Sequence, residues 1–234
     1  MTELTGSMSI DLGAQIDDMV RLGGGAAGRY APASELRPPI TAPQRITLPD
    51  AELMLWRELF TASESAGYFQ SLSDGVDWRQ DRITLFGRTV NSPRLTAWYG
   101  EAGVTYAYSG LSLVAGGWLA ALLSIRERVG QAAGTNFNSV LLNLYRNEAD
   151  SMGWHSDDEP SLGPNPVIGS VNFGNTRTFQ LQHKRCKAYR SVIDLTHGSL
   201  LLMSGATQHH WRHRVPKSNV PCGPRINLTF RTIR

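Results

Sequence analysis

The chain has little that would stabilise a small secreted domain or anchor a protein in a membrane. Cys186 and Cys222 are its only cysteines and form no CxxC pair, so neither a disulfide framework nor a zinc knuckle is predicted. No apolar run approaches the roughly 20 residues of a membrane span. The first twelve residues lack the basic and then apolar run of a signal peptide. We therefore expect a cytoplasmic protein that does not bind membranes.

Acidic residues are scarce in the last quarter of the chain. From Arg177 to Arg234 there are eleven Lys or Arg and one acid, Asp194, whereas the first 176 residues hold twelve basic and nineteen acidic residues. The net charge of +3 therefore conceals a basic C-terminal part. Such clusters neutralise phosphates, although single lysines are usually just solvated. The candidate polyanion-binding residues are Arg177, Lys184, Arg185, Lys187, Arg190, Arg212, Arg214 and Lys217.

Length and composition predict one soluble domain behind an N-terminal arm. The chain has 234 residues, of which 41% are hydrophobic and 18% charged, enough to bury a substantial core. Residues 1–44 are rich in Gly, Ala and Pro and are expected to form a flexible arm, which leaves 45–234 as the domain.

The domain is expected to be mainly β (α+β). Spacing and capping residues predict helices over 62–72, with Thr61 or Ser63 as its N-cap, and 117–129. Short apolar or alternating runs separated by turn residues predict a double-sheet jelly roll braced by these helices. The expected strands are 139–145, 167–173, 176–183, 190–195, 199–204 and 225–231.

The segment Trp154-His155-Ser156-Asp157 is a candidate metal site. On an extended backbone residues i and i+2 project to the same side, so His155 and Asp157 can reach one ion. Two imidazoles and one carboxylate leave three positions open, which suits ferrous iron, whereas a structural zinc site is closed by four ligands. An isolated His-x-Asp also occurs by chance. Spacing does not choose the third ligand among His209, His210 and His213.

The segment from Arg225 to Arg231 alternates between polar and apolar residues, which is the pattern of a strand with one polar face. Two guanidiniums on one face of an apolar strand need anions, and a guanidinium matches a carboxylate in a bidentate way. A ligand with two carboxylates would satisfy both arginines. The alternative is a solvated edge strand.

In their order along the chain, these motifs resemble the AlkB family of Fe(II)/2-oxoglutarate-dependent dioxygenases. The resemblance covers about residues 46 to 234, and 138–163 look like the mammalian homologues that repair alkylated nucleic acid. It implies a double-stranded β-helix that uses Fe(II), 2-oxoglutarate and O2. The matching segments are 85–87, 93–100, 143–145, 155–160, 197–200, 213–216 and the Arg-x-Asn-x-Thr-Phe-Arg ending.

The resemblance also assigns the catalytic centre. It implies His155, Asp157 and His213 as iron ligands, with His213 chosen by its His-x-Val-Pro context. His209 and His210 are then expected at the surface or behind the ligands, and His183 has no assigned role. The residues implied around 2-oxoglutarate are Asn143, Tyr145, Arg225, Asn227 and Arg231, with Arg225 on the distal carboxylate and Arg231 on the one near iron; Tyr145 could instead be a core tyrosine.

The substrate implied by the resemblance is DNA carrying 1-methyladenine or 3-methylcytosine, with RNA as a further substrate. The reaction releases formaldehyde. A nucleotide-recognition lid is expected at about 80–110, before a catalytic core at about 138–234. Within it Tyr108 would stack on the base opposite His155, beside Tyr106, and Trp98 and Tyr99 offer further flat surfaces. Aromatic side chains are more often part of a core.

Two further residues bear on substrate choice. Glu159 follows the ligands, and a carboxylate there would favour a cationic methylated base, although it could be an ordinary loop acid. Phe86, beside Gly87, could wedge into a duplex from a hairpin tip. Residues 138–163 instead look like homologues that favour single strands and RNA, so either strand form remains open.

We expect a monomer. Two other classes of function are consistent with parts of the sequence: an oxygenase of the same kind acting on a protein or small molecule, and a noncatalytic nucleic-acid-binding module.

Overall fold

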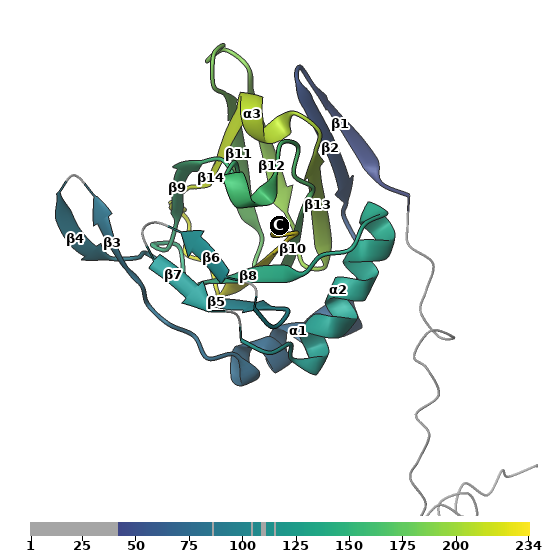
Figure 1. Ribbon diagram of the computed structural model, residues 1–234, viewed down its shortest axis with the longest axis vertical. Coiled ribbons are helices and arrows are strands. Elements are labelled where there is room, and N and C mark those ends of the chain that lie inside the picture. The colour runs from purple at the N-terminus through teal and green to yellow at the C-terminus, as the bar shows by residue number, and fades with distance from the viewer. Residues whose placement is uncertain (1–41, 86, 104, 109–110, 115) are drawn as a thin grey trace, which may run out of the picture. The chain divides into compact units, whose positions relative to one another are not determined.

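The computed structural model describes residues 42–85, 87–103, 105–108, 111–114 and 116–234, and it confirms the mainly β fold class with bracing helices. Two antiparallel sheets form the jelly roll (Figure 1). The larger has the strand order β1-β2-β13-β10-β15-β8-β5, and the smaller has the order β12-β11-β14-β9. Among the described residues no helix has the length and hydropathy needed to cross a membrane.

The strands have the following bounds. The larger sheet contains β1 (Gln44–Leu48), β2 (Ala51–Trp56), β13 (Ser199–Ser204), β10 (Ile168–Gly174), β15 (Arg225–Arg231), β8 (Ser139–Tyr145) and β5 (Leu95–Gly100). The smaller contains β12 (Arg190–Leu195), β11 (Arg177–His183), β14 (Trp211–Val215) and β9 (Met152–His155). Two hairpins stand apart, β3 (Arg82–Leu85) with β4 (Arg88–Asn91) and β6 (Thr105–Tyr108) with β7 (Leu111–Val114).

The core has two parts, one on each face of the larger sheet. One face packs under the helices α1 (Ala62–Gly75) and α2 (Ala120–Ala133), and the other faces the smaller sheet (Figure 1). Strand β15 shows how the sequence builds both. Ile226, Leu228 and Phe230 are fully buried on the helix side. The polar residues alternating with them therefore point between the sheets, where the candidate site lies.

The helices begin and end where local chemistry allows. Of the two N-cap residues that the sequence offered, Thr61 caps α1, in a capping box with Glu64. Helix α2 begins at Ala120 rather than at 117, without a side-chain cap, and it ends at Ala133 before Gly134, which adopts the left-handed conformation (φ 63°). Its buried residues include Leu122, Ile125 and Val129.

All six predicted strands are present, but the jelly roll uses more of the chain than expected. Strands β1, β2 and β5 belong to its larger sheet and precede residue 138, where the sequence placed the start of the catalytic core. The short strands β9 and β14 were not predicted. Of the proposed arm, residues 1–41 lie outside the described residues. The hairpins β3–β4 and β6–β7 occupy the segment expected to form the lid.

Candidate metal centre

His155, Asp157 and His213 converge at one end of the smaller sheet. His155 ends β9, and its direct cross-strand partner on β14 is His213. Asp157 lies two residues beyond the end of β9. One ligand atom from each of the three lies within 4.8 Å of the others, and their side chains line one pocket between the sheets. The expected triad is therefore assembled, with the third ligand placed by strand pairing that spacing alone could not reveal.

Neighbouring groups fix the orientation of each ligand. The Nδ1 of His155 lies 2.9 Å from the carbonyl oxygen of Gly153, so this nitrogen carries the proton and Nε2 is left to bind an ion. Phe179 stacks on His213 with ring centroids 5.1 Å apart. The Asp157 amide donates to Gln208 Oε1 over 3.0 Å. The ligands are thus held in place before any ion binds.

The environment keeps the ligands in metal-binding protonation states. Burial lowers the pKa of His213 to about 3 and also lowers the pKa of His155, so both imidazoles are neutral near pH 7. Burial alone would raise the pKa of Asp157. The Arg231 guanidinium, 2.6 Å from its Oδ1, outweighs that effect and holds the Asp157 pKa below its usual value. Two neutral imidazoles and a carboxylate form the donor set that suits ferrous iron.

Polar side chains that could bind a carboxylic acid line the same pocket as the triad. Strands β8 and β15 pair so that Arg225 lies opposite Tyr145 and Asn227 lies opposite Asn143, and all four side chains line the pocket. Arg225 is 1% exposed, and its guanidinium lies 5.0 Å from the centre of the Tyr145 ring. Burial lowers its pKa to about 10, so it stays charged at neutral pH.

Arg225 is incompletely satisfied within the part of the chain that the structure describes. Its Nη2 donates to Asn172, but Nε and Nη1 have no hydrogen-bond partner. Buried charged donors without partners are costly, and a carboxylate would satisfy both. The pocket therefore fits 2-oxoglutarate as well as iron.

Arg231 has a different role from Arg225. Its Nη2 forms a buried ion pair with Asp157, which binds it directly to a metal ligand. This position agrees with its expected place near the iron-side carboxylate, and it also explains why Asp157 stays ionised.

Sequence reasoning missed several supporting residues. Arg94 is buried and its Nε donates to Asn143 Oδ1 over 2.7 Å. Its place in the matched segment 93–100 was the available signal. Gln208 and Asn172 had none, because each acts through a contact between strands distant in sequence.

The structure treats the proposed substrate residues differently. Tyr99 is 9% exposed and packs in the core on the helix side, away from the pocket, so it is not placed to contact a base. Trp98 is also buried; it pairs with Leu141, which puts it on the pocket face, yet it does not line the pocket. Glu159 is half-buried, two residues after Asp157 and just before the short turn of helix Pro160–Leu162, and it does not line the pocket.

The remaining substrate residues are described only in part. Tyr106 and Tyr108 lie on β6, but their side chains are outside the described atoms. Phe86 lies outside the described residues. Gly87 beside it has φ 75°, which agrees with the tight hairpin turn expected there.

One member of the basic cluster is structural. Arg177 is 4% exposed and donates to the carbonyl oxygens of Asn147, Asp150 and Pro216, so it is not available to a phosphate. Arg212 and Arg214 lie over the ring of Trp154 at 5.0 and 4.6 Å.

Comparisons with known proteins agree with this site. Residues 52–231 match the 2OG-Fe(II) oxygenase superfamily. The chain is 45% identical to bovine (Bos taurus) alpha-ketoglutarate-dependent dioxygenase alkB homolog 3 over 73% of its own length and 62% of that protein. It is 40% identical to the human (Homo sapiens) DNA oxidative demethylase ALKBH2, over 75% of this chain and 71% of that one.

The chain therefore spans less than two thirds of the length of its bovine relative. The solved structure of OsALKBH1 shares the fold, with a TM-score of 0.58 and 17% identity over 81% of this chain and 99% of that one. With the His155–Asp157–His213 triad assembled and Arg225 in the same pocket, the chain belongs to the AlkB family of the 2OG-Fe(II) oxygenase superfamily.

Proposed function

We propose that this protein is an Fe(II)/2-oxoglutarate-dependent dioxygenase that demethylates N-alkylated bases in DNA, with 1-methyladenine and 3-methylcytosine as substrates and RNA as a further one. One observation carries the oxygenase part. The His155–Asp157–His213 triad and the two unpartnered N–H groups of Arg225 face the same buried pocket.

Each group of pocket residues has a distinct role in this proposal. His155, Asp157 and His213 would hold the iron, which when bound supplies the centre where O2 and 2-oxoglutarate react to oxidise the alkyl carbon. Arg225, with Tyr145 beside it, would bind the distal carboxylate of 2-oxoglutarate. Hydroxylation of an N-methyl group gives a hydroxymethyl adduct, which breaks down to formaldehyde and the unmodified base.

The proposal of a nucleic-acid substrate is supported by the positive charge of the C-terminal part and by the relatives. The C-terminal part keeps its basic excess even without the buried Arg177. One relative is named a DNA oxidative demethylase. A half-buried carboxylate at Glu159, two residues after Asp157 in the sequence, suits a cationic methylated base better than a neutral one.

Turnover of methylated oligonucleotides tests the proposal. Single- and double-stranded DNA and RNA, each with one methylated base, are incubated with Fe(II) and 2-oxoglutarate and followed by mass spectrometry. We expect each oligonucleotide to lose about 14 mass units, because hydrogen replaces the methyl group, and we expect equal amounts of formaldehyde and succinate to form. Asp157→Ala should abolish both products. Asp74→Ala is the matched control, because this carboxylate is exposed on α1 and is outside the triad.

The result also separates the alternatives. An oxygenase for a protein or small molecule would turn over 2-oxoglutarate without stimulation by methylated oligonucleotides. A noncatalytic binding module would show no iron-dependent turnover at all. Either outcome would rule out the demethylase.

The hairpin β3–β4 bears on whether duplex or single-stranded substrates are preferred. We propose that Phe86 occupies the gap left by a flipped base in a duplex. Phe86→Ala should then slow duplex repair more than single-strand repair. Val90→Ala, an exposed apolar change on the same hairpin, should affect neither. Equal slowing of both substrates by Phe86→Ala would show that the wedge idea is wrong.

A further inference from the structure

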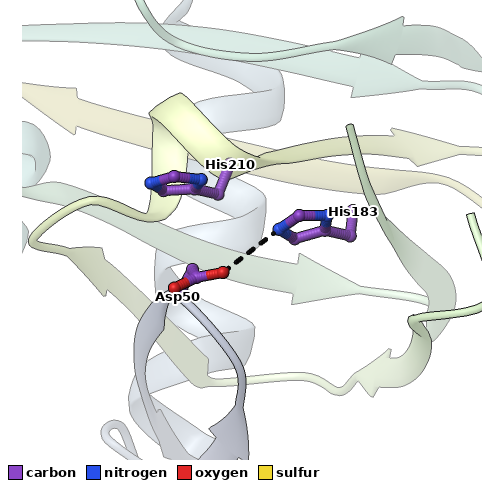
Figure 2. Close-up of side chains that lie close together, drawn as sticks. All are labelled: Asp50, His183 and His210. Atoms are coloured by element: carbon purple, nitrogen blue, oxygen red, sulfur yellow. Dashed lines mark ion pairs between the residues drawn. The ribbon is translucent and has the colours of Figure 1, made fainter. Parts of the chain in front are cut away.

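A second group of metal-binding side chains lies outside the catalytic pocket. Asp50, His183 and His210 each offer a ligand atom within 4.8 Å of the other two, and they share no residue with the catalytic triad. Figure 2 shows the three side chains converging from three separate elements. Asp50 is in the β1–β2 turn, His183 is the last residue of β11, and His210 ends the short helix α3 (Thr207–His210).

Hydrogen bonds tie these three elements together. The indole Nε1 of Trp211 donates to the carbonyl oxygen of Pro49 over 2.8 Å, which holds the β1–β2 turn against the chain beside His210. The amide of Lys184 donates to the carbonyl oxygen of His210 over 2.7 Å, which joins the end of β11 to α3. The ligand positions are therefore fixed by the fold rather than by flexible side chains.

His183 is the strongest pointer to a ligand. It is 5% exposed, and its Nε2 has no hydrogen-bond partner among the described residues. That nitrogen lies 3.4 Å from Asp50 Oδ2, longer than the usual 2.7–3.2 Å of an N–H···O bond. Two ligands held at about 2.1 Å by a tetrahedral ion lie about 3.4 Å apart. The spacing therefore suits a shared cation better than a direct hydrogen bond.

The other two residues complete the donor set. The His210 ring is nearly parallel to that of His183, with centroids 5.9 Å apart. Asp50 adopts φ 54°, the only positive φ of a non-glycine residue in the described chain. Asp50 is the second residue of the two-residue turn between β1 and β2, where an aspartate tolerates this conformation. Its Oδ2 lies 3.4 Å from His183 Nε2, so the carboxylate faces that imidazole.

We propose that Asp50, His183 and His210 bind a second divalent transition-metal ion of the zinc type. Two imidazoles and one carboxylate match the nitrogen and oxygen donors that Zn²⁺ accepts. Asp50 is exposed, so water completes the coordination and the ion reaches the site from solvent.

Metal binding has a consequence for the neighbouring basic turn. The Cys186 amide donates to His183 Nδ1 over 2.9 Å, so in the metal-free ring the proton sits on Nε2. An ion on Nε2 moves that proton to Nδ1, which can no longer accept from the amide. The turn between β11 and β12, which carries Lys184, Arg185 and Lys187, must then shift. Cys186 is an exposed free thiol and reports such a shift directly.

Metal stoichiometry tests the site. Isothermal titration of Zn²⁺ into Asp157→Ala, which lacks the carboxylate of the catalytic triad and keeps only its two imidazoles, should still show one tightly bound equivalent. Adding Asp50→Asn or His210→Ala should weaken that equivalent at least tenfold. These residues are not fully buried, so the variants should fold. His209→Ala is the matched control, because this exposed neighbour contacts Asn165 and is outside the group. Cys186→Ser checks that the thiol is not the ligand.

Thiol reactivity gives an independent readout. In Asp157→Ala, saturating Zn²⁺ should change the rate at which a disulfide reagent modifies Cys186, and Asp50→Asn should remove that change. The proposal is overturned if Asp157→Ala binds no Zn²⁺, or if its Zn²⁺ affinity is the same with and without Asp50→Asn. Because catalysis is not measured, failure here leaves the proposed demethylase untouched.

Discussion

Replacing Arg225 by methionine should weaken the binding of 2-oxoglutarate without lowering the stability of the ligand-free protein. Two of the guanidinium N–H positions lack partners in the described structure, so the ligand-free protein gains little from the buried charge. An unsatisfied buried donor costs about 1–3 kcal/mol. Methionine has similar bulk and can still contact the Tyr145 ring. Asn172 keeps a donor, because Asn227 Nδ2 lies 3.2 Å from its Oδ1. Ligand-free Arg225→Met should therefore be as stable as the unchanged protein, or more so.

Binding of 2-oxoglutarate should fall sharply in the same variant. Each charge-assisted hydrogen bond contributes about 1.5–3 kcal/mol, so losing two costs at least about 3 kcal/mol, or at least about 100-fold in Kd. At a concentration 100 times the original Kd, the ligand stabilises the unchanged protein by about 2.7 kcal/mol. It should stabilise Arg225→Met by about 0.4 kcal/mol at most.

Thermal and urea unfolding with Mn²⁺ present and oxygen excluded, with and without 2-oxoglutarate, measures both effects. Arg214→Met is the control, since Arg214 lies over Trp154 and does not line the pocket. The reasoning is refuted if Arg225→Met keeps the full stabilisation by 2-oxoglutarate. It is also refuted if the ligand-free variant loses several kcal/mol.

Three further predictions follow from individual contacts. Because the pKa of His213 is lowered to about 3 in the folded chain from 6.5, its contribution to stability is present above pH 6.5 and lost as pH falls toward 3. The metal affinity of the triad, measured by titration, should accordingly stay level from about pH 7.5 to 5.5. An exposed histidine would lose about tenfold in metal affinity over this range, because it becomes protonated. A tenfold loss at the triad would therefore contradict the burial argument. Gly198→Ala should cost about 2–4 kcal/mol in urea unfolding, because φ is +78° and the new Cβ would lie 2.5 Å from Ser65 Oγ. Gly117→Ala, with open space around it, should change little. Thr61→Ala should lower stability by about 1 kcal/mol through loss of the α1 cap, and an unchanged urea midpoint would show that the cap is dispensable.

The sequence predicted the parts of the site that follow a local pattern. Alternation along 225–231 placed Arg225 and Asn227 on one face, and the pairing of β15 with β8 confirms that they face Asn143 and Tyr145. The capping signal at Thr61 likewise located α1. In each case the information lies within a few residues of the chain, so it can be read without the fold.

Other features depend on contacts that no local pattern encodes. Tyr99 looked like a flat surface for a base, but strand β5 turns it toward the helices, where its ring gains more from burial. Arg177 looked like part of a phosphate-binding cluster, yet it satisfies three carbonyl oxygens in the interior. A single sequence gives the residue type and the periodicity, whereas strand order decides which face is buried.

The same dependence on strand order links the two histidine-containing groups. The Lys184 side chain, one residue after His183, donates to the carbonyl oxygen of Gln208 and to Asp158, the neighbour of the iron ligand Asp157. The side chain of Gln208 in turn accepts from the Asp157 amide. A shift of the turn after His183 therefore reaches the iron-ligand loop through Lys184. If Zn²⁺ moves that turn, iron affinity at the triad should change with it, and Lys184→Met should uncouple the two sites.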